Sequence, residues 1–264
     1  MAQPYESFYE RFDSPLMQRV RSMSYGEDVG QNSWVTANEL RADATRLALG
    51  AHSRLLDLGC GPCGPLTFLV QTTGCAGTGL DASAAALASG KARADAIGVA
   101  LDLQMHDLNL RLPFDDATFD AIISVDVILH VRDRQPLLRE AERVLVPSGR
   151  LLFIDAGVVT GAISNDEAQL RSANGLSHFV AVGYNESLIA AAGLQLIETE
   201  DRTESVVRVA NDRLRALHTY RKELDAMTGR EAQARYEQYL QTVHALAARR
   251  ALSRLMYLAM RPAV

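Results

Sequence analysis

The chain has 264 residues, of which 48% are hydrophobic and 22% are charged, a composition that excludes a disordered or fibrous protein. Its 27 Lys and Arg are outnumbered by 32 Asp and Glu, so the net charge of −5 argues against a nucleic-acid-binding surface. No apolar run reaches the roughly 18 residues that a membrane span needs. Because the start is acidic and the chain has only three cysteines, we expect a cytoplasmic protein without membrane contact or a disulfide framework.

The first 50 residues are mixed in character and rich in aromatic side chains, and a helical cap is predicted there. Residues 25–34 contain two glycines and an asparagine, so they are predicted to form a loop. A loop that presents so many aromatic and polar groups is typical of binding rather than of packing.

Short apolar runs alternate with helical segments from residue 53 to about 200. Strands are predicted at 53–58, 76–81, 101–105, 119–127, 149–155 and 194–200, and helices at 83–97, 133–145 and 184–193. Parallel neighbours need a crossover helix, so this alternation predicts a mostly parallel α/β sheet with helices on both faces. Residues 202–250 are helix-forming and basic, with ten Lys or Arg against six Asp or Glu, and 253–262 read as a last strand.

The most informative segment is 55–64, LLDLGCGPCG, in which a buried-type strand runs into a glycine-rich turn and a helix. Glycines there let the backbone approach a nucleotide, and the helix start offers free N–H groups. The glycine pattern alone also fits the fingerprint of dehydrogenases. However, Asp57 stands where those enzymes usually have an apolar residue, and Asp81 ends the next strand, where a carboxylate can accept both ribose hydroxyls.

A further aspartate follows the third predicted strand. Asp107 and the N–H of Leu108 can read the edge of an adenine there. Taken in order, Asp-x-Gly-x-Gly, Asp81, Asp107-Leu108 and PSGRLLFID at 147–155 resemble the class I S-adenosylmethionine-dependent methyltransferases over about residues 50–200. The resemblance implies S-adenosyl-L-methionine as cofactor and a Rossmann-like, seven-stranded sheet whose last strand inserts antiparallel, the place that 253–262 would take.

The resemblance also assigns parts of the cofactor to individual residues. Gly59 and Gly61 would flank its methionine part, Asp81 its ribose, and Asp107 with Leu108 its adenine. The full expected set of cofactor-binding residues is Tyr25, Trp34, Asp57, Gly59, Gly61, Asp81, Ala82, His106, Asp107, Leu108, Ser124 and Asp126.

Two flanking segments resemble a narrower group. Gly26-Glu27-Asp28-Val29 is similar to the Gly-Glu-Asp-Ile segment of sarcosine and dimethylglycine N-methyltransferases, which closes over the cofactor. That pattern usually continues His-x-Gly-x-Tyr, whereas this chain has Gln-Asn-Ser-Trp at 31–34, which leaves the acceptor open. Residues 202–250 resemble the helical insertion that roofs the active site in those enzymes, and one or two of its arginines facing inward would bind an anionic group of the substrate.

Together these features predict a helical cap at 1–50, a cofactor-binding core at 51–201, a helical lid at 202–250 and a final strand at 251–264. The expected reaction is an in-line methyl transfer to a small molecule, with the nitrogen of an amino acid or amine favoured over oxygen or carbon. The donor supplies its own leaving group, so no metal is expected. His130, just past the fourth strand, and His178, after the fifth, are the candidate general bases.

Other interpretations stay open from the sequence. The basic segment permits an RNA or protein methyltransferase, although 124–127 is Ser-Val-Asp-Val in place of an Asn/Asp-Pro-Pro-Tyr/Phe motif. A nicotinamide-dependent oxidoreductase would leave Asp57 and Asp107 without a role, and a non-catalytic cofactor sensor fits the same motifs. Cys60 and Cys63 form a C-x-x-C, for which packing is expected over a redox pair or half a zinc site. A monomer and a homodimer fit equally.

Overall fold

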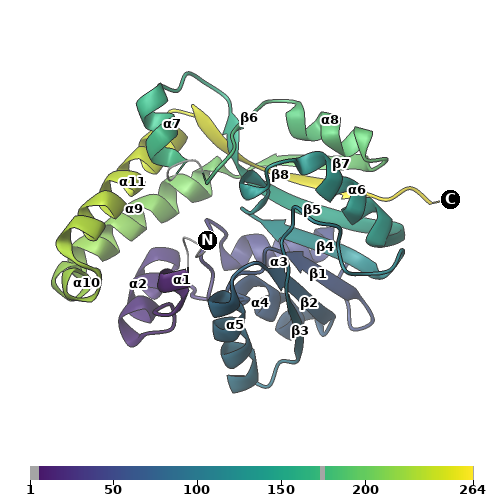
Figure 1. The fold of residues 1–264 in the computed structure, drawn as a ribbon, viewed down its shortest axis with the longest axis horizontal. Helices are drawn as coiled ribbons and strands as arrows, with labels where there is room; N and C mark the ends of the chain where they lie inside the picture. The colour runs from purple at the N-terminus through teal and green to yellow at the C-terminus, as the bar shows by residue number, and fades with distance from the viewer. Residues whose placement is uncertain (1–5, 173–175, 264) are drawn as a thin grey trace.

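The computed structural model describes residues 6–172 and 176–263, so residues 1–5 of the expected cap and Val264 of the expected last segment lie outside it. In the described residues one eight-stranded sheet has the order β3-β2-β1-β4-β5-β8-β7, with the short β6 beside β5 (Figure 1). The strands are β1 Arg54–Leu58, β2 Ala76–Asp81, β3 Leu101–Met105, β4 Phe119–Val125, β5 Leu145–Val159, β6 Val180–Ala181, β7 Gln195–Asp201 and β8 Leu252–Met260.

Only β8 runs against its neighbours, since it pairs antiparallel with both β5 and β7. The predicted mostly parallel sheet with an antiparallel last strand is therefore confirmed. Its strands differ from the prediction in several details. The two-residue β6 is added, and β5 extends beyond the predicted 149–155 at both ends. In addition, β4 ends at Val125 instead of residue 127, and β8 is Leu252–Met260 instead of 253–262.

Helices are set by local capping signals as well as by packing. Ser83 caps α5 by accepting the Ala86 N–H, and Thr36 forms a capping box with Glu39 at the start of α3. The helices are α1 Glu6–Tyr9, α2 Pro15–Tyr25, α3 Ala37–Arg46, α4 Gly64–Thr73, α5 Ala84–Ala96, α6 Arg134–Val144, α7 Asn165–Arg171, α8 Tyr184–Ala191, α9 Thr203–Thr219, α10 Arg221–Thr228 and α11 Arg230–Ala248, with a 3₁₀ turn at Ile128–His130. In the part of the chain described, none is long and apolar enough to cross a membrane.

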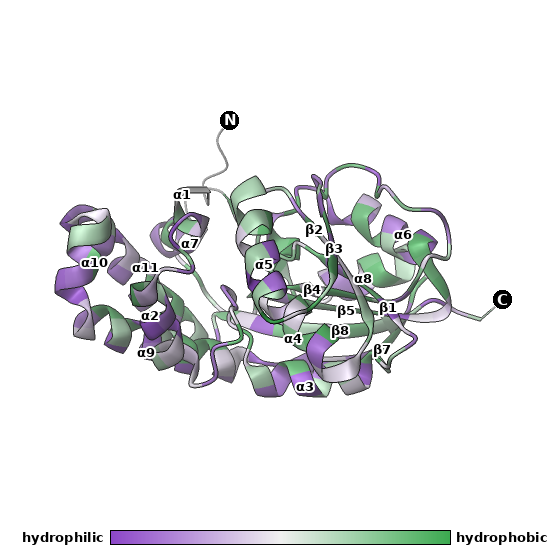
Figure 2. Ribbon diagram, turned by 90° about the horizontal axis from the view of Figure 1, so that it is seen from below, coloured by the Kyte–Doolittle hydropathy of each residue, from purple (hydrophilic) through white to green (hydrophobic). Residues whose placement is uncertain are grey.

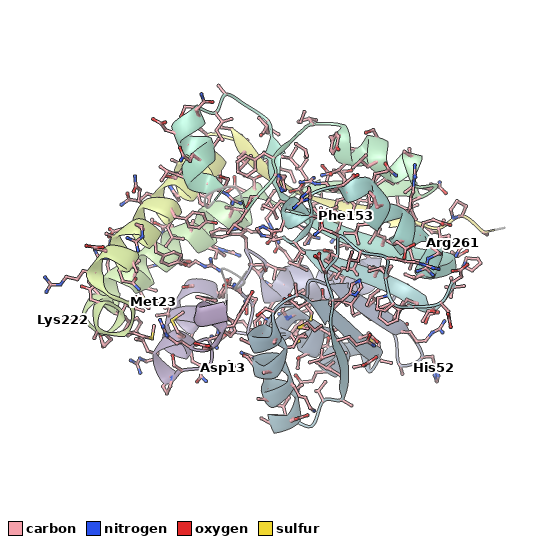
Figure 3. All side chains as sticks on the ribbon, in the orientation of Figure 1. Asp13, Met23, His52, Phe153, Lys222 and Arg261 are labelled. Carbon is pink, nitrogen blue, oxygen red and sulfur yellow. The ribbon has the colours of Figure 1, made fainter. Side chains whose placement is uncertain are left out.

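Successive residues of a central strand point to opposite faces of the sheet and so belong to two separate hydrophobic cores. Leu56 points to the face covered by α6 and α8, whereas Leu55 points to the face covered by α3 and α4. Phe153, near the middle of β5, is 1% exposed, while Lys222 and His52 lie at the periphery (Figure 3). Hydrophobic and hydrophilic residues separate to different sides most clearly in α6 and α9, and much less in α4 and α5 (Figure 2).

A third core lies outside the sheet. Helices α9 to α11, here called the helical insertion (Thr203–Ala248), pack with α2 around Val209, Leu217 and Leu240. This bundle stands at one side of the sheet (Figure 1). The insertion connects β7 to β8, which are paired neighbours. It therefore starts at the end of β7 and returns to the sheet at the adjacent start of β8.

Candidate active site

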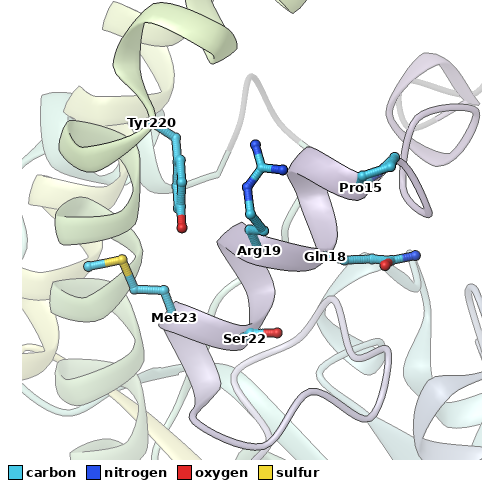
Figure 4. Close-up of a pocket in the computed structure, with 6 residues that line it drawn as sticks. All are labelled: Pro15, Gln18, Arg19, Ser22, Met23 and Tyr220. Carbon is cyan, nitrogen blue, oxygen red and sulfur yellow. The ribbon is translucent and has the colours of Figure 1, made fainter.

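A cavity of about 620 Å³ opens at the carboxyl ends of the parallel strands, the usual ligand position in such sheets. Its wall combines the loops after β1, β2, β3 and β4 with residues 32–34 and side chains of the helical insertion. A second, more open hollow lies between α2 and Tyr220 (Figure 4). Among the described residues, Arg19 and Tyr220 are the ionisable side chains that line this hollow, and no carboxylate or imidazole lines it. The first cavity is therefore the candidate site.

The glycine-rich loop forms one wall of this cavity. The N–H groups of Gly59 and Cys60 both donate to the carbonyl of Leu80, which binds the loop to the end of β2. Gly59 has a φ of 80°, and a Cβ there would lie 2.4 Å from a methyl group of Val127. This position therefore requires glycine for its conformation and for space.

Two carboxyl groups lie beside that loop in different electrostatic states. Asp81 accepts the N–H of Gly61 on Oδ2 at 2.8 Å and the N–H of Ser83 on Oδ1 at 2.9 Å, so its orientation is fixed. Asp57 is 2% exposed, and burial together with the nearby charge of Asp81 raises its pKa to about 8. Asp57 is thus mostly protonated at neutral pH.

The loop after β3 adds a polar corner. Asp107 accepts one hydrogen bond from the backbone N–H of Asn109 and one from its side-chain amide. These two bonds, the backbone bond above all, hold the pKa of Asp107 below its usual range. Among the described residues, none hydrogen-bonds to the buried Nε2 of His106. An orphaned polar atom in a cavity wall is suited to a polar ligand.

His130 is also part of the cavity wall. Its Nδ1 lies 2.7 Å from the carbonyl oxygen of Leu176, which can only accept, so Nδ1 carries the hydrogen and Nε2 is the basic nitrogen. Desolvation lowers the pKa of His130 below 6.5, and the charge of Arg171 acts in the same direction, while the bond to Leu176 opposes them. A neutral imidazole is therefore the prevailing form at pH 7.

Asp126 joins three parts of the chain at the end of β4. One of its oxygens accepts the Trp34 N–H at 2.9 Å and the other accepts Nε of Arg254 at 2.8 Å. Arg254 in turn reaches Glu39 at 3.1 Å. Asp126 adopts a left-handed φ of 57°, which few non-glycine residues adopt without such partners.

A further part of the wall is cationic and aromatic. The Arg213 guanidinium lies 4.5 Å from the centre of the Trp34 ring and donates to the carbonyl of Ser33 at 2.8 Å. Arg171 donates to the Tyr239 hydroxyl at 3.4 Å and to the carbonyl of Ala156 at 3.1 Å. This part of the wall therefore presents two guanidinium groups that are bonded to neutral acceptors.

Most residues singled out in the sequence meet in this one cavity. Those in its wall are Trp34, Asp57, Gly59, Gly61, Asp81, Ala82, His106, Asp107, Leu108, Asp126 and His130. Tyr25, Ser124 and His178 are described but are not in the wall. The Tyr25 and Ser124 hydroxyls bond the carbonyls of Ser33 and Leu58.

The ring of His178 is exposed outside the cavity for a local reason. Its backbone N–H donates to the carbonyl of Leu129 at 2.7 Å, and its carbonyl accepts from Arg134 at 2.8 Å. The neighbouring Ser177 lines the cavity in its stead.

Cys60 and Cys63 lie in the hydrophobic core, with unbridged thiols 3.7 Å apart. The Cys63 thiol occupies the space next to Gly90, where a Cβ would lie 2.4 Å from its sulfur. Packing accounts for both side chains, and the close Cys63 thiol together with burial raises the pKa of Cys60.

Sequence reasoning missed several residues of the cationic wall. Tyr236 and Tyr239 are three residues apart, a spacing that places both on one face of α11 and offers a weak signal. Arg213 belongs to the basic segment in which an inward-facing arginine was expected, but the sequence did not indicate which one. Nothing in the sequence around Arg171 marks it.

Comparison with known proteins gives a consistent result. Residues 56–153 match the family described as methyltransferase domain. The chain is 29% identical over 209 residues to a glycine/sarcosine/dimethylglycine N-methyltransferase of Actinopolyspora halophila, covering 79% of this chain and 36% of that protein. It is 31% identical over 167 residues to the methyltransferase GfsG of Streptomyces halstedii, covering 60% and 59%. The chain thus spans less than two thirds of the length of these relatives.

A solved structure shares nearly the whole fold. Phosphoethanolamine N-methyltransferase 2 of Haemonchus contortus, in complex with phosphomonomethylethanolamine and S-adenosylhomocysteine, superposes with a TM-score of 0.82 at 19% identity. The likeness covers 99% of this chain and 61% of that one. It therefore includes the helical insertion as well as the sheet.

Proposed function

Because the chain carries a methyltransferase domain with the fold of the S-adenosylmethionine-dependent methyltransferases, we propose that it transfers a methyl group from S-adenosylmethionine to the nitrogen of a small amine or amino acid. One observation carries this proposal: the glycine loop, Asp57, Asp81 and the loop after β3 share one wall of a single cavity. N-methyltransferases among the relatives support the choice of nitrogen.

The cavity wall fits the cofactor by its chemistry. Asp81 would accept the ribose hydroxyls, Asp107 and the N–H of Leu108 would bind the adenine, and Gly59 and Gly61 would flank the methionine part. The orphaned Nε2 of His106 gives the nucleotide a further partner. When bound, the cofactor would supply a methyl group on a sulfonium, and its sulfur would leave as a neutral thioether that needs no protein acid.

The remaining work of the protein is to orient the acceptor, to exclude water and to take up a proton. Trp34 and the helical insertion cover the cavity opposite the sheet. An amine must lose its proton to act as a nucleophile, and Nε2 of His130 would accept that proton as the general base.

We also propose a cytoplasmic location. All three cysteines carry free thiols, including the pair whose sulfur atoms lie 3.7 Å apart. A reducing compartment keeps such thiols free.

The function is tested in two steps. Calorimetric titration with S-adenosylhomocysteine measures cofactor binding, for which we expect saturable binding with one site per chain. Labelled S-adenosylmethionine is then offered with panels of small amines, small hydroxyl compounds, bulk RNA and bulk protein. Label transfer to the amines supports the proposal. Transfer only to hydroxyl compounds, RNA or protein would contradict the choice of acceptor, and absence of cofactor binding would contradict the whole proposal.

Replacing His130 by asparagine is expected to lower kcat about 100-fold, within the usual range for loss of a general base. In the parent protein, kcat/KM for an amine should fall as the pH drops through a value below 6.5, because protonation removes the basic lone pair and the pKa of His130 is depressed. The variant should lack this acidic limb. His52, exposed and far from the cavity (Figure 3), gives the matched control His52→Asn. An unchanged acidic limb in His130→Asn would assign the titration to another group.

A further inference from the structure

Among the described buried arginines, the one at the candidate site differs from the others because it has no carboxylate partner. Five arginines are buried in the described part of the chain, and four of them lie 2.5 to 3.0 Å from a carboxylate oxygen. The fifth is Arg171, which is 5% exposed and bonds only a tyrosine hydroxyl and a carbonyl among the described residues. A buried cation without a counter-charge is costly to the fold, so its retention calls for a partner.

Arg213 is the second unbalanced cation in the same cavity. Its described partners are the Tyr25 hydroxyl and the carbonyls of Asn32 and Ser33, all of them neutral. Burial raises the pKa of Tyr25, so that hydroxyl is not an anion. The other arginines of α9 differ: Arg215, two residues further on, is exposed and pairs with Asp212 at 3.1 Å.

The anchoring bonds of these two arginines do not use all their donors. A guanidinium has five N–H groups, and Arg171 spends two described hydrogen bonds on Tyr239 and Ala156. Both residues belong to the cavity wall, so their remaining N–H groups are donors that a ligand there could use. Forked N–H groups match the oxygens of a carboxylate or a phosphate.

We propose that Arg171 and Arg213 form the anion-binding subsite of the acceptor pocket, so that the acceptor is an amine bearing a carboxylate or phosphate group. This inference rests on the proposed function and adds the substrate class, which the fold leaves undetermined. The subsite and His130 belong to the same cavity. An acceptor held at one end by its anionic group would present its amine toward the interior of the site.

The chain contains its own reporter for this subsite. Trp34 is its single tryptophan, it lines the cavity, and the Arg213 guanidinium lies 4.5 Å from its ring centre. Protein saturated with S-adenosylhomocysteine is titrated with two matched pairs of probes while Trp34 emission is followed. Sarcosine is compared with its neutral amide, and phosphoethanolamine is compared with ethanolamine.

We expect a saturable change with the anionic member of at least one pair and about 10- to 100-fold weaker binding of its partner without the anion, the size of one or two lost charged hydrogen bonds. The pair with the tighter anionic member identifies carboxylate or phosphate. Arg171→Gln and Arg213→Gln should weaken that anion by a similar factor, whereas Arg215→Gln should bind as the parent does. Arg171→Lys and Arg213→Lys, which keep the charge but lose the fork, serve wherever a glutamine variant does not fold.

Equal binding of the probes with and without the anionic group, absence of a response to either anion, or unchanged anion binding in the folded Arg171 and Arg213 variants would overturn the subsite. S-adenosylhomocysteine affinity, measured separately by calorimetry, should stay the same in all these variants. Failure of the parent protein to bind S-adenosylhomocysteine would contradict the proposed function instead, so the two failures are distinguishable.

Discussion

Replacing Asp81 by alanine is expected to weaken binding of S-adenosylhomocysteine about a hundredfold. Its carboxylate is fixed at the cavity wall by the N–H groups of Gly61 and Ser83 and would accept the two ribose hydroxyls. Two charge-assisted hydrogen bonds are worth roughly 3 kcal/mol together, which corresponds to about two orders of magnitude in affinity. Calorimetry measures the loss directly.

The variant also removes the acceptor for two loop N–H groups, so the loop itself needs a check. Asp81→Asn keeps one side-chain oxygen that can accept, and it should lose less affinity than the alanine variant. Asp95→Ala, an exposed aspartate on α5 paired with Lys91, is the matched control and should bind as the parent does. Unchanged affinity in a folded Asp81→Ala protein would remove Asp81 from the cofactor site.

Asp57→Asn should make the protein more stable at neutral pH. The pKa of Asp57 is about 8 in the folded state, against 3.8 for an unperturbed aspartate. Both states are protonated below pH 4, and as the pH rises only the unfolded chain releases its proton, which destabilises the fold until Asp57 ionises near pH 8. The stability of the variant over the parent should therefore grow by up to about 1.4 kcal/mol per pH unit between pH 4 and 8.

Urea denaturation at several pH values between 5 and 8.5 measures this difference. Asp102→Asn, an exposed position in β3, controls for the loss of one negative charge and should follow the parent at every pH. Parallel stability curves for Asp57→Asn and the parent would mean that Asp57 is ionised in the fold at neutral pH. In that case, the interpretation of Asp57 as a protonated group beside Asp81 would be wrong.

The sheet and the glycine-loop wall could be predicted because their signals are local in sequence. Most strands of the core contain a short apolar run, and the loop is recognisable because Gly59 has a conformation and a contact with Val127 that exclude other residues. Asp81 and Asp107 directly follow or end strands, so the parallel sheet brings them to one edge. A single sequence is enough to predict features of this kind.

The cationic wall could not be predicted because it depends on distant partners. Tyr239, which bonds Arg171, lies 68 residues further along the chain. The sequence contains 27 Lys and Arg, and what sets Arg171 and Arg213 apart is that they line the cavity with only neutral hydrogen-bond partners among the described residues, which tertiary packing determines. His178 illustrates the reverse case, because the neighbouring Ser177 lines the cavity, while His178 itself is exposed outside it and its backbone bonds Leu129 and Arg134.

The position of the helical insertion has a consequence for how this fold can diversify. Strands β7 and β8 are antiparallel neighbours whose pairing closes with Asp201 opposite Leu255, so everything between them is topologically one long hairpin loop. Loop length costs little in closure entropy, and a sheet tolerates exchange of such a segment. A transplanted insertion would bring its own version of Arg213, Tyr236 and Tyr239 while leaving the glycine loop and Asp81 in place. Acceptor choice and cofactor choice can therefore evolve as separate modules on one sheet.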